Sequence, residues 1–361
     1  MKRPFGKALV CLLLAPSLVA AGCGSSSKSS SSSGASTPSV ATAPSTPSTG
    51  TIPVGHRTIG IIGNTFTSEI LKRLANDEKA TVQALGWKAI VIDGQATPQG
   101  WNAGLDTLIA NKVDAILVGA IEAAPIQAEL QKAKQAGIPV FSAGLDTFPD
   151  TAKHEIVVGE SSVALGHEAA ALIKQRFPTA KVLAEDVSPV YAAHAFHTTA
   201  LADLAKDGIP VVGTFDVDLA DLVNSMAKGA AALAQAHPDA KVYLSCCDFG
   251  PPILATAFQQ INRNDITVVS RSDDPSTLKL LAAGQSNVVL VPDIDQHIFK
   301  VMTRLLAHFA GGKPLDTSND VSSTTTKTID KSNNHGELVF PFPPELSKQL
   351  AIWGKTYKLG G

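Results

Sequence analysis

The sequence predicts an α/β protein built on parallel β-sheets, and three observations support this prediction. Short apolar runs alternate with longer amphipathic runs from residue 58 onward, which is the pattern of repeated β-α units. Roughly 300 residues follow the N-terminal region, enough for two lobes of ordinary size. Aromatic residues make up only 5% of the chain, whereas Ala, Val, Ile and Leu are abundant, as suits parallel sheets buried under Ala-rich helices.

The order of the elements follows from hydrophobic periodicity, and the first run ends near residue 142. Ser68 and Gly86 are the expected N-cap and stop of its first helix. The expected elements of this run are a strand at 58–62, a helix at 68–85, a strand at 88–92, a helix at 100–111, a strand at 115–118, a helix at 125–136 and a strand at 139–142.

A second run of the same kind begins near Glu155 and is followed by a polar tail after Pro314. Its expected strands are 156–158, 181–184, 210–214, 241–245, 267–270 and 288–291. Its expected helices are 164–177, 192–206, 222–236, 252–262 and 296–310.

The N-terminal region is a processing signal rather than part of the fold. Basic residues precede a stretch at 8–21 that is too short to cross a bilayer, which takes ~20 apolar residues. The small residues before Cys23 resemble the bacterial lipobox, so we expect a signal peptide at 1–22 and a lipidated Cys23. The alternative is an ordinary signal peptide with an incidental cysteine. The Ser-, Thr- and Pro-rich segment within 23–56 is expected to be a flexible tether.

Charge, cysteine content and motifs exclude several classes of function. The net charge is −2 and no basic stripe is present, so nucleic acid is not an expected partner. Cys246 and Cys247 are adjacent, which excludes a conventional disulfide, and a metal site needs more ligands at suitable spacing. We therefore expect no metal and no cofactor. The chain lacks a nucleophile elbow, a zinc-protease motif and a dinucleotide fingerprint, so it is not expected to be an enzyme.

From about Arg57 to Pro314 the chain resembles the type I periplasmic sugar-binding proteins, the ribose- and galactose-binding group. The order and spacing of several short matches make the likeness specific. They are the turn at 64–66, Gly86, the segments 113–117 and 132–140, the segment 159–166, and Cys247 with Asp248.

The resemblance implies two doubly wound lobes joined by three crossovers, with a ligand held between them and a hinge that closes on it. It places the first lobe at 57–157 plus 289–318, and the second at 158–288 plus about 319–361. The chain then crosses between lobes near Asp150, near Asn287 and in the polar tail. The implied protein is an extracytoplasmic monomer, attached to the cell membrane through its lipid.

The strand-end rule for open α/β sheets and the resemblance select the same loops for the ligand site. Aromatic rings stack on sugar C–H faces, and planar polar groups take paired hydroxyls. The candidate ligand-binding residues of the first lobe are Asn64, Phe66, Thr67, Trp101, Glu122 and Asp146. Those of the second lobe are Tyr191, His194, His197, Asp248, Phe249, Arg271, Asp273 and Asp293. For each loop Asp the competing interpretation is a solvated turn or a helix cap.

Three positions depart from the family pattern, and they leave the identity of the ligand open. The family often has Asp-Arg after the fourth strand, where this chain has Gly144 and Leu145. An Arg on a second-lobe helix is replaced by His194 and His197, and an Asn-Asp pair by Cys247 and Asp248. Loss of these bidentate groups means that a standard pentose or hexose site is not predicted.

His194 and His197 share one face of a predicted helix, and three interpretations stand beside one another. They hydrogen-bond a ligand, they are solvated or capping residues, or they form a metal pair with Cys246 or Cys247.

For the protein as a whole, the sequence predicts a binding protein that delivers a small molecule, a sugar or a sugar-like compound, to the permease of an ABC-type importer. The alternative function is a receptor subunit that presents its ligand to a sensor kinase or chemoreceptor.

Overall fold

The computed structural model describes residues 50–145, 155–285 and 287–360. The predicted signal peptide, Cys23 and most of the tether lie outside the described residues, and so does Asp146. None of the helices in the described ranges has the length and apolar character needed to span a bilayer.

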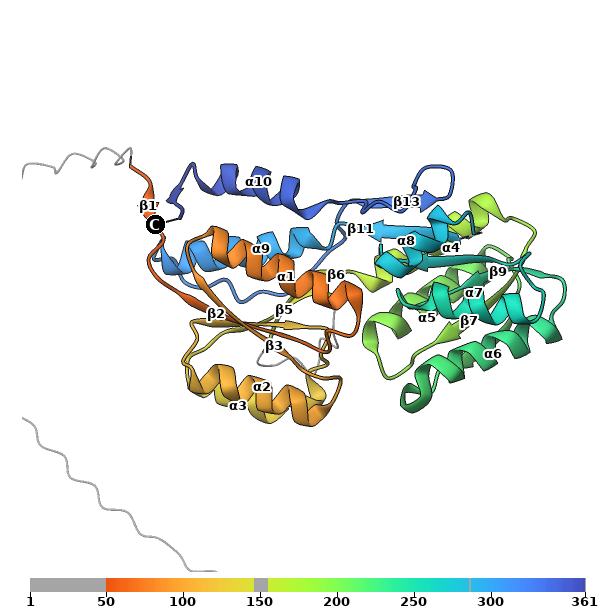
Figure 1. Cartoon of the computed structure of the whole chain (residues 1–361), viewed down its shortest axis with the longest axis horizontal. Coiled ribbons are helices and arrows are strands. Elements are labelled where there is room, and N and C mark those ends of the chain that lie inside the picture. Colours follow the sequence, from red (N-terminus) through yellow and green to blue (C-terminus); the bar gives the residue numbers. More distant parts are fainter. Residues whose placement is uncertain (1–49, 146–154, 286, 361) are drawn as a thin grey trace, which may run out of the picture. The chain divides into compact units, whose positions relative to one another are not determined.

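The first lobe contains a parallel six-stranded sheet in the order β3-β2-β4-β5-β6-β12 (Figure 1). Its strands are β2 (Thr58–Gly63), β3 (Lys88–Asp93), β4 (Ala115–Gly119), β5 (Val140–Leu145), β6 (Ile156–Glu160) and β12 (Asp320–Val321). Its helices are α1 (Glu69–Ala84), α2 (Pro98–Ala110), η1 (Ala124–Ile126), α3 (Gln127–Gln135), α9 (Asp295–Phe309) and α10 (Phe342–Trp353).

Helices cover both faces of this sheet because alternate strand residues point to opposite sides. Ile61 and Leu117 face the core that includes α1 and α9, whereas Ile62 and Val118 face the core that includes α2 and α3. The N-cap of α1 is Ser68, as predicted, and its side chain accepts a hydrogen bond from the Leu71 backbone amide.

The second lobe contains another six-stranded sheet, in the order β8-β7-β9-β10-β11-β13, with only β13 antiparallel. Its strands are β7 (Lys181–Asp186), β8 (Val211–Asp216), β9 (Ala240–Leu244), β10 (Thr267–Arg271), β11 (Asn287–Pro292) and β13 (Thr326–Asp330). Its helices are α4 (Ser162–Arg176), α5 (Tyr191–Lys206), η2 (Leu219–Asp221), α6 (Leu222–Ala236), α7 (Gly250–Gln260) and α8 (Pro275–Ala282). Helices α4 to α7 share one large apolar core with the sheet, built around Tyr243 and Phe196.

The connections between the lobes differ in detail from the predicted positions. Strand β6 remains in the first sheet to Glu160, and β11 lies in the second sheet to Pro292, so these crossovers fall later than expected. The polar tail passes between lobes twice: β12 pairs with β6, β13 pairs with β11, and α10 then packs against α1 and α9. The tail is thus shared by both lobes rather than belonging to the second.

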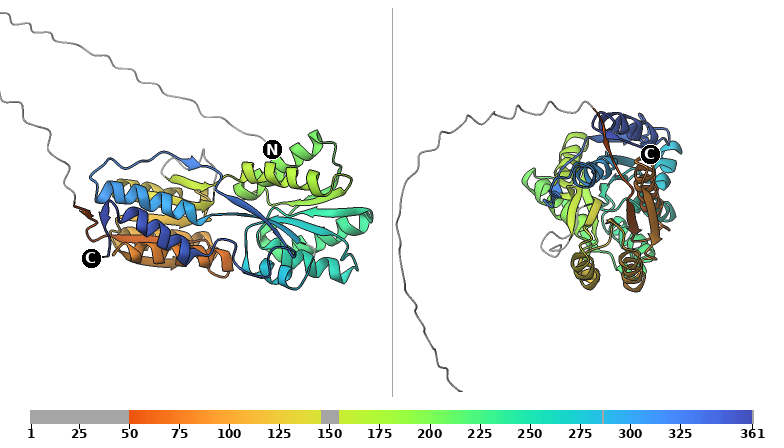
Figure 2. Two further views of the ribbon diagram at one scale, coloured as in Figure 1. Left: turned by 90° about the horizontal axis from the view of Figure 1, so that it is seen from above. Right: turned by 90° about the vertical axis from the view of Figure 1, so that its left-hand side faces the viewer.

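The remaining elements join the two ends of the described chain. Strand β1 (Ile52–Pro53) pairs in parallel with β14 (Tyr357–Lys358), so the chain leaves the fold beside the point where it enters (Figure 2). Helices α8 and α10 and the strands of the tail are additions to the elements that periodicity predicts.

Candidate functional site

The order of the strands defines one position in each sheet where a ligand site is expected. In both sheets the chain reverses its direction of winding, between β2 and β4 in the first and between β7 and β9 in the second. Open α/β sheets bind ligands beyond the carboxyl ends of the strands at such a switch point. The loops that follow β2, β4, β7 and β9 are therefore the candidate site.

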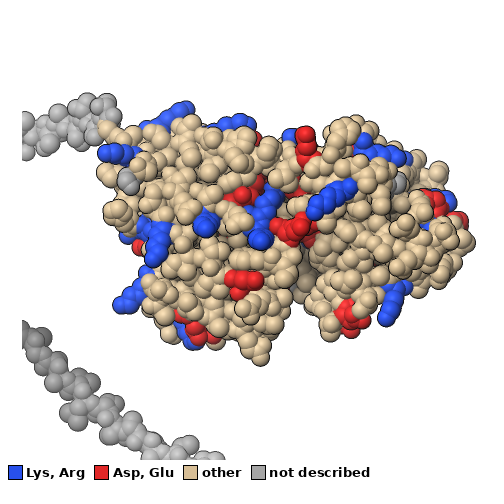
Figure 3. Space-filling model, in the orientation of Figure 1, with Lys and Arg blue, Asp and Glu red and all other residues tan. Residues whose placement is uncertain are grey.

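Contacts between the lobes show that these strand ends lie toward one another. The Tyr191 backbone amide, after β7, donates a hydrogen bond of 3.2 Å to Glu122 Oε1, after β4. Arg73 on α1 pairs with Asp273, after β10, at 3.3 Å. Figure 3 shows a furrow between the lobes on one face, with acidic and basic side chains gathered along its upper part.

Asn64 organises the first-lobe half of this site. Its side-chain nitrogen donates to the Ala120 carbonyl at 2.8 Å, which ties the loops after β2 and β4 together. Its own carbonyl accepts hydrogen bonds from Trp101 Nε1 at 3.1 Å and from the Ala96 amide at 2.8 Å. The side-chain nitrogen, which the sequence offered to a ligand, is therefore bonded within the loop framework.

The two predicted aromatic residues of the first lobe, Phe66 and Trp101, are both half-buried beside glycines. A methyl group on Gly63 would lie 2.6 Å from the ring of Phe66, and one on Gly94 would lie 2.4 Å from that of Trp101. Glycine at these two positions therefore permits the close approach of each ring to the backbone. Thr67 is exposed, and its hydroxyl lies 2.9 Å from that of Thr65.

The two candidate histidines are in different environments. His194 Nδ1 lies 2.6 Å from Asp186 Oδ2, so a carboxylate at the end of β7 orients this half-exposed ring. His197 is buried, its Nδ1 has no hydrogen-bond partner among the described residues, and burial lowers its pKa. The group of possible metal ligands around Cys246 and Cys247 contains Glu185 and neither histidine. The structure therefore does not support the interpretation of the two histidines as a metal pair with a cysteine.

Arg271 is held inside the second lobe rather than projecting freely. Its Nε donates to the Cys246 carbonyl at 2.9 Å, its Nη1 donates to Ser162 Oγ at 3.2 Å, and its guanidinium lies 5.5 Å from the centre of the Phe196 ring. Asp248 lies in the loop after β9, as Cys246 does, and burial raises the pKa of its carboxyl. The next residue, Phe249, packs partly against the core.

Asp273 and Asp293 lie where the lobes join. Both are buried. Asp273 accepts hydrogen bonds from Arg73 and from the Val339 amide, each at 3.3 Å. Asp293 accepts one from Gln296 Nε2 at 3.1 Å. Asp273 thus links the second lobe to α1 and to the tail, whereas the contact of Asp293 is local, to the first turn of α9.

Sequence reasoning missed a set of buried acids near this junction. Burial raises the pKa of Asp295 to about 7 and that of Glu78 to about 8. Glu155, close to Glu122, is also buried, and burial raises its pKa to about 8. A signal for one of them was present: Glu78 stands four residues from both Leu74 and Val82, on the apolar stripe of α1.

Backbone conformation also marks these loops. Gln95, Ala96, Ala120 and Ser272, which all follow strand ends, have positive φ between 53° and 65°. Residues other than glycine rarely adopt this left-handed conformation, and such strain concentrates at ligand sites.

The profile of the family described as periplasmic binding protein domain matches residues 59–314. The chain belongs to this family. The match covers most of both lobes and confirms the resemblance and the fold class that the sequence predicted. A curated relative, the ribose import binding protein RbsB of Bacillus subtilis (strain 168), is 25% identical over 186 residues. That alignment spans 50% of this chain and 59% of the relative.

Solved structures of periplasmic binding proteins share the fold. The myo-inositol binding protein of Caulobacter, bound to myo-inositol, matches with a TM-score of 0.66 and 16% identity, over 79% of this chain and 97% of its own. An ABC transporter solute-binding protein from Agrobacterium vitis, bound with α-D-tagatopyranose, matches with a TM-score of 0.66 and 22% identity, over 77% and 95%. At these identities the likeness shows the fold alone.

Gly144 gives a structural reason for one departure from the pattern of periplasmic binding proteins. It has a φ of +94°, and a methyl group there would lie 3.1 Å from Leu74 Cδ2. A side chain is therefore disfavoured at this point of β5. The relatives are described as binding proteins and as an ABC sugar transporter subunit.

Two hollows on the second lobe lie away from the candidate loops at the carboxyl ends of β7 and β9. One, of about 530 Å³, is lined by α4 and α5 residues including His167 and Asp203, and the other, of about 550 Å³, by residues including Leu201 and Pro210. Neither includes a candidate residue, so topology and interlobe contacts, rather than hollow size, define the candidate site.

Proposed function

We propose that this protein is an extracytoplasmic solute-binding lipoprotein, which captures a small polyhydroxy molecule between its lobes and delivers it to an ABC-type importer. The observation that supports this best is the meeting of the two switch points, where the Tyr191 amide of the second lobe bonds Glu122 of the first at 3.2 Å. A solute bound there would contact both lobes and would favour their closed arrangement.

The relatives support the chemical class of the solute. The curated relative is named as a ribose import protein, and the solved structures hold sugars or polyols such as D-allose, allitol and myo-inositol. The candidate site of this chain offers groups suited to sugar recognition, in the half-buried Phe66 and Trp101 and in the polar groups of Glu122 and His194. Gly144 and Cys247 still distinguish this site from the usual pattern, so we propose a sugar or a sugar-like compound rather than one named sugar.

The lipid anchor is proposed from sequence, because Cys23 lies outside the described residues. Metabolic labelling with a radioactive fatty acid in a bacterial host tests it. We expect label on the parent chain and none on Cys23→Ser. Equal labelling of the two chains would contradict the anchor.

A thermal-shift screen of the full chain carrying Cys11→Ser and Cys23→Ser tests the binding role. Sugars, polyols, nucleosides and small aromatic compounds are the ligand classes. A true ligand at a hundredfold excess over its Kd stabilises the fold by about 2.7 kcal/mol. We expect a shift within the sugar and polyol classes, and absence of any shift would contradict the proposal. Loss of uptake of that compound in a deletion strain would support delivery to an importer, whereas unchanged uptake would favour a sensory role.

A further inference from the structure

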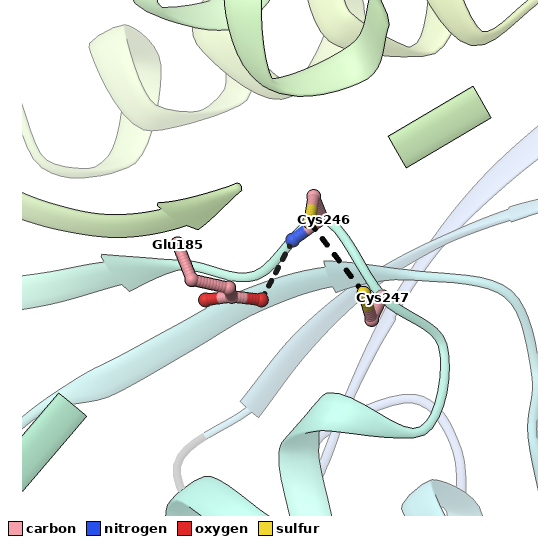
Figure 4. A group of neighbouring side chains, drawn as sticks. All are labelled: Glu185, Cys246 and Cys247. Atoms are coloured by element: carbon pink, nitrogen blue, oxygen red, sulfur yellow. Dashed lines mark hydrogen bonds between the residues drawn. The ribbon is translucent and has the colours of Figure 1, made fainter. Parts of the chain in front are cut away.

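A buried cluster of two thiols and a carboxyl lies at the switch point of the second lobe. Glu185 comes from the end of β7, and Cys246 and Cys247 follow β9, so the two strands that flank the switch point supply all three groups. The two sulfur atoms and a Glu185 carboxylate oxygen lie within 4.8 Å of one another (Figure 4). In the described part of the chain, this is the group of three or more His, Cys, Asp or Glu side chains whose possible metal-binding atoms lie this close together.

The cluster is closed to solvent. The exposed fraction is 0% for Glu185 and Cys246 and 5% for Cys247. Glu185 Oε1 accepts hydrogen bonds from Ser245 Oγ at 2.6 Å and from the Cys246 amide at 3.0 Å, which fix the orientation of the carboxyl. The Tyr243 hydroxyl also interacts with this carboxyl, so the cluster is held by polar groups on β7 and β9.

The spacing of the sulfur atoms suits ligands of one cation. Cys246 Sγ and Cys247 Sγ are 3.5 Å apart. Two sulfur ligands of a tetrahedral Zn²⁺, each at about 2.3 Å from the metal, are roughly 3.8 Å apart. Thiolates are soft donors and a carboxylate oxygen is a hard one, and Zn²⁺ accepts both types.

We propose that Glu185, Cys246 and Cys247 form a binding site for a thiophilic divalent cation of the Zn²⁺ type. Two thiolates and a carboxylate around a doubly charged cation leave one negative charge. Arg271, whose Nε donates to the Cys246 carbonyl at 2.9 Å, supplies a positive charge beside it. Three protein ligands leave the fourth position of a tetrahedral site to a donor outside this set.

This site goes beyond the proposed solute-binding function and is tested without any solute. Neither its ligand set nor Glu185 follows from the sequence analysis, which expected no metal because two adjacent cysteines offer too few ligands. The third ligand stands 61 residues from Cys246 and only the parallel sheet brings it close.

Cobalt substitution tests the proposal most sharply. The full chain carrying Cys11→Ser and Cys23→Ser keeps only the two thiols of the cluster, and is reduced and stripped of metal before titration with Co²⁺ and then Zn²⁺. We expect one Co²⁺ per chain, with a thiolate-to-cobalt absorption band in the near ultraviolet that Zn²⁺ removes. A cobalt spectrum without this band, or no stoichiometric binding by the reduced chain, would overturn the proposal.

Ligand variants assign the donors. Cys246→Ser and Cys247→Ser should each weaken Zn²⁺ affinity by roughly 100-fold or more, since even outer-shell partners of a metal contribute about 10- to 100-fold. Glu185→Gln should weaken it while keeping the thiolate band. The matched control is Glu78→Gln, a buried carboxyl of the other lobe, which should bind Zn²⁺ like the parent. Mass spectrometry of chain purified without reductant, before and after treatment with a thiol reductant, is a further test, because a Cys246–Cys247 disulfide that survives the treatment would leave no thiolates and would contradict the site.

Discussion

Glu78 predicts an unusual dependence of stability on pH. Its side chain lies on the buried face of α1 with an exposed fraction of 2%, and its Oε1 has no hydrogen-bond partner among the described residues. Burial is the main cause that raises its pKa from 4.5 to about 8, and the neighbouring carboxyls Asp77 and Asp295 add to the effect. The folded protein therefore keeps this carboxyl protonated at pH values where the unfolded chain releases the proton.

The sign and size of the effect follow from proton linkage. Between pH 4.5 and about 8 the folded state binds more protons than the unfolded state, so the free energy of unfolding falls as pH rises. At about 1.4 kcal/mol for each pH unit, the loss over that range is on the order of 5 kcal/mol. Above about pH 8 both states are ionised, and this contribution becomes constant.

Glu78→Gln keeps the shape of the side chain and removes the titration. Urea denaturation at about pH 5 and about pH 8 measures the free energy of unfolding of both chains. We expect the variant to lose several kcal/mol less than the parent between these two pH values. Glu337→Gln, at an exposed position, is the matched control and should behave as the parent. Equal pH dependence of Glu78→Gln and the parent would refute the reasoning.

Three further substitutions test the interlobe junction and the site loops by denaturation. Arg73→Met removes the partner of the buried Asp273 and Asp295, and loss of one member of a buried pair costs about 3–5 kcal/mol; a cost below about 1 kcal/mol would show that the pairs are unimportant. Trp101→Phe loses the hydrogen bond to the Asn64 carbonyl and should cost about 1 kcal/mol; unchanged stability would contradict the loop framework. Gly144→Ala puts a side chain at a φ of +94° and should cost about 1–2 kcal/mol or more; a stabilised variant would contradict the strain.

Much of the fold could be predicted because it is encoded locally. Every strand and helix expected from periodicity is present within a few residues, and Ser68 caps α1 as its sequence context indicates. Helix α8 carried a recognisable start signal as well, since Asp274 accepts the Ser276 amide and Pro275 opens the helix. With only eight residues, α8 is too short to show a clear hydrophobic periodicity.

The parts that could not be predicted depend on contacts between distant segments. Strand β13 has a polar sequence and forms because β11 offers it an antiparallel partner. Strand β12 is only two residues long, and the Asp320–Val321 pairing with β6 is invisible to any local pattern. For this reason the allocation of the tail to the two lobes was wrong in detail.

The same limit applies to the candidate site. The strand-end rule selected two loops that the structure brings to the interlobe junction, those of Glu122 and Tyr191, and the loop of Asn64, which is bonded to the loop after β4. It did not reveal which polar groups are already engaged. The partner of Asp273 is Arg73, 200 residues earlier in the sequence, and no spacing rule connects them.

Capture of a solute between the lobes is the central claim, and calorimetric titration of the compound found by the screen tests it most directly. We predict binding of one molecule per chain, strongly weakened by Phe66→Ala, whose ring lies at the first-lobe switch point. Phe309→Ala, half-buried at the end of α9, is the control and should bind like the parent. Glu122→Ala, which changes the first-lobe loop after β4, is a second test of the site. If both Phe66→Ala and Glu122→Ala bind the compound with the affinity of the parent, the account is contradicted.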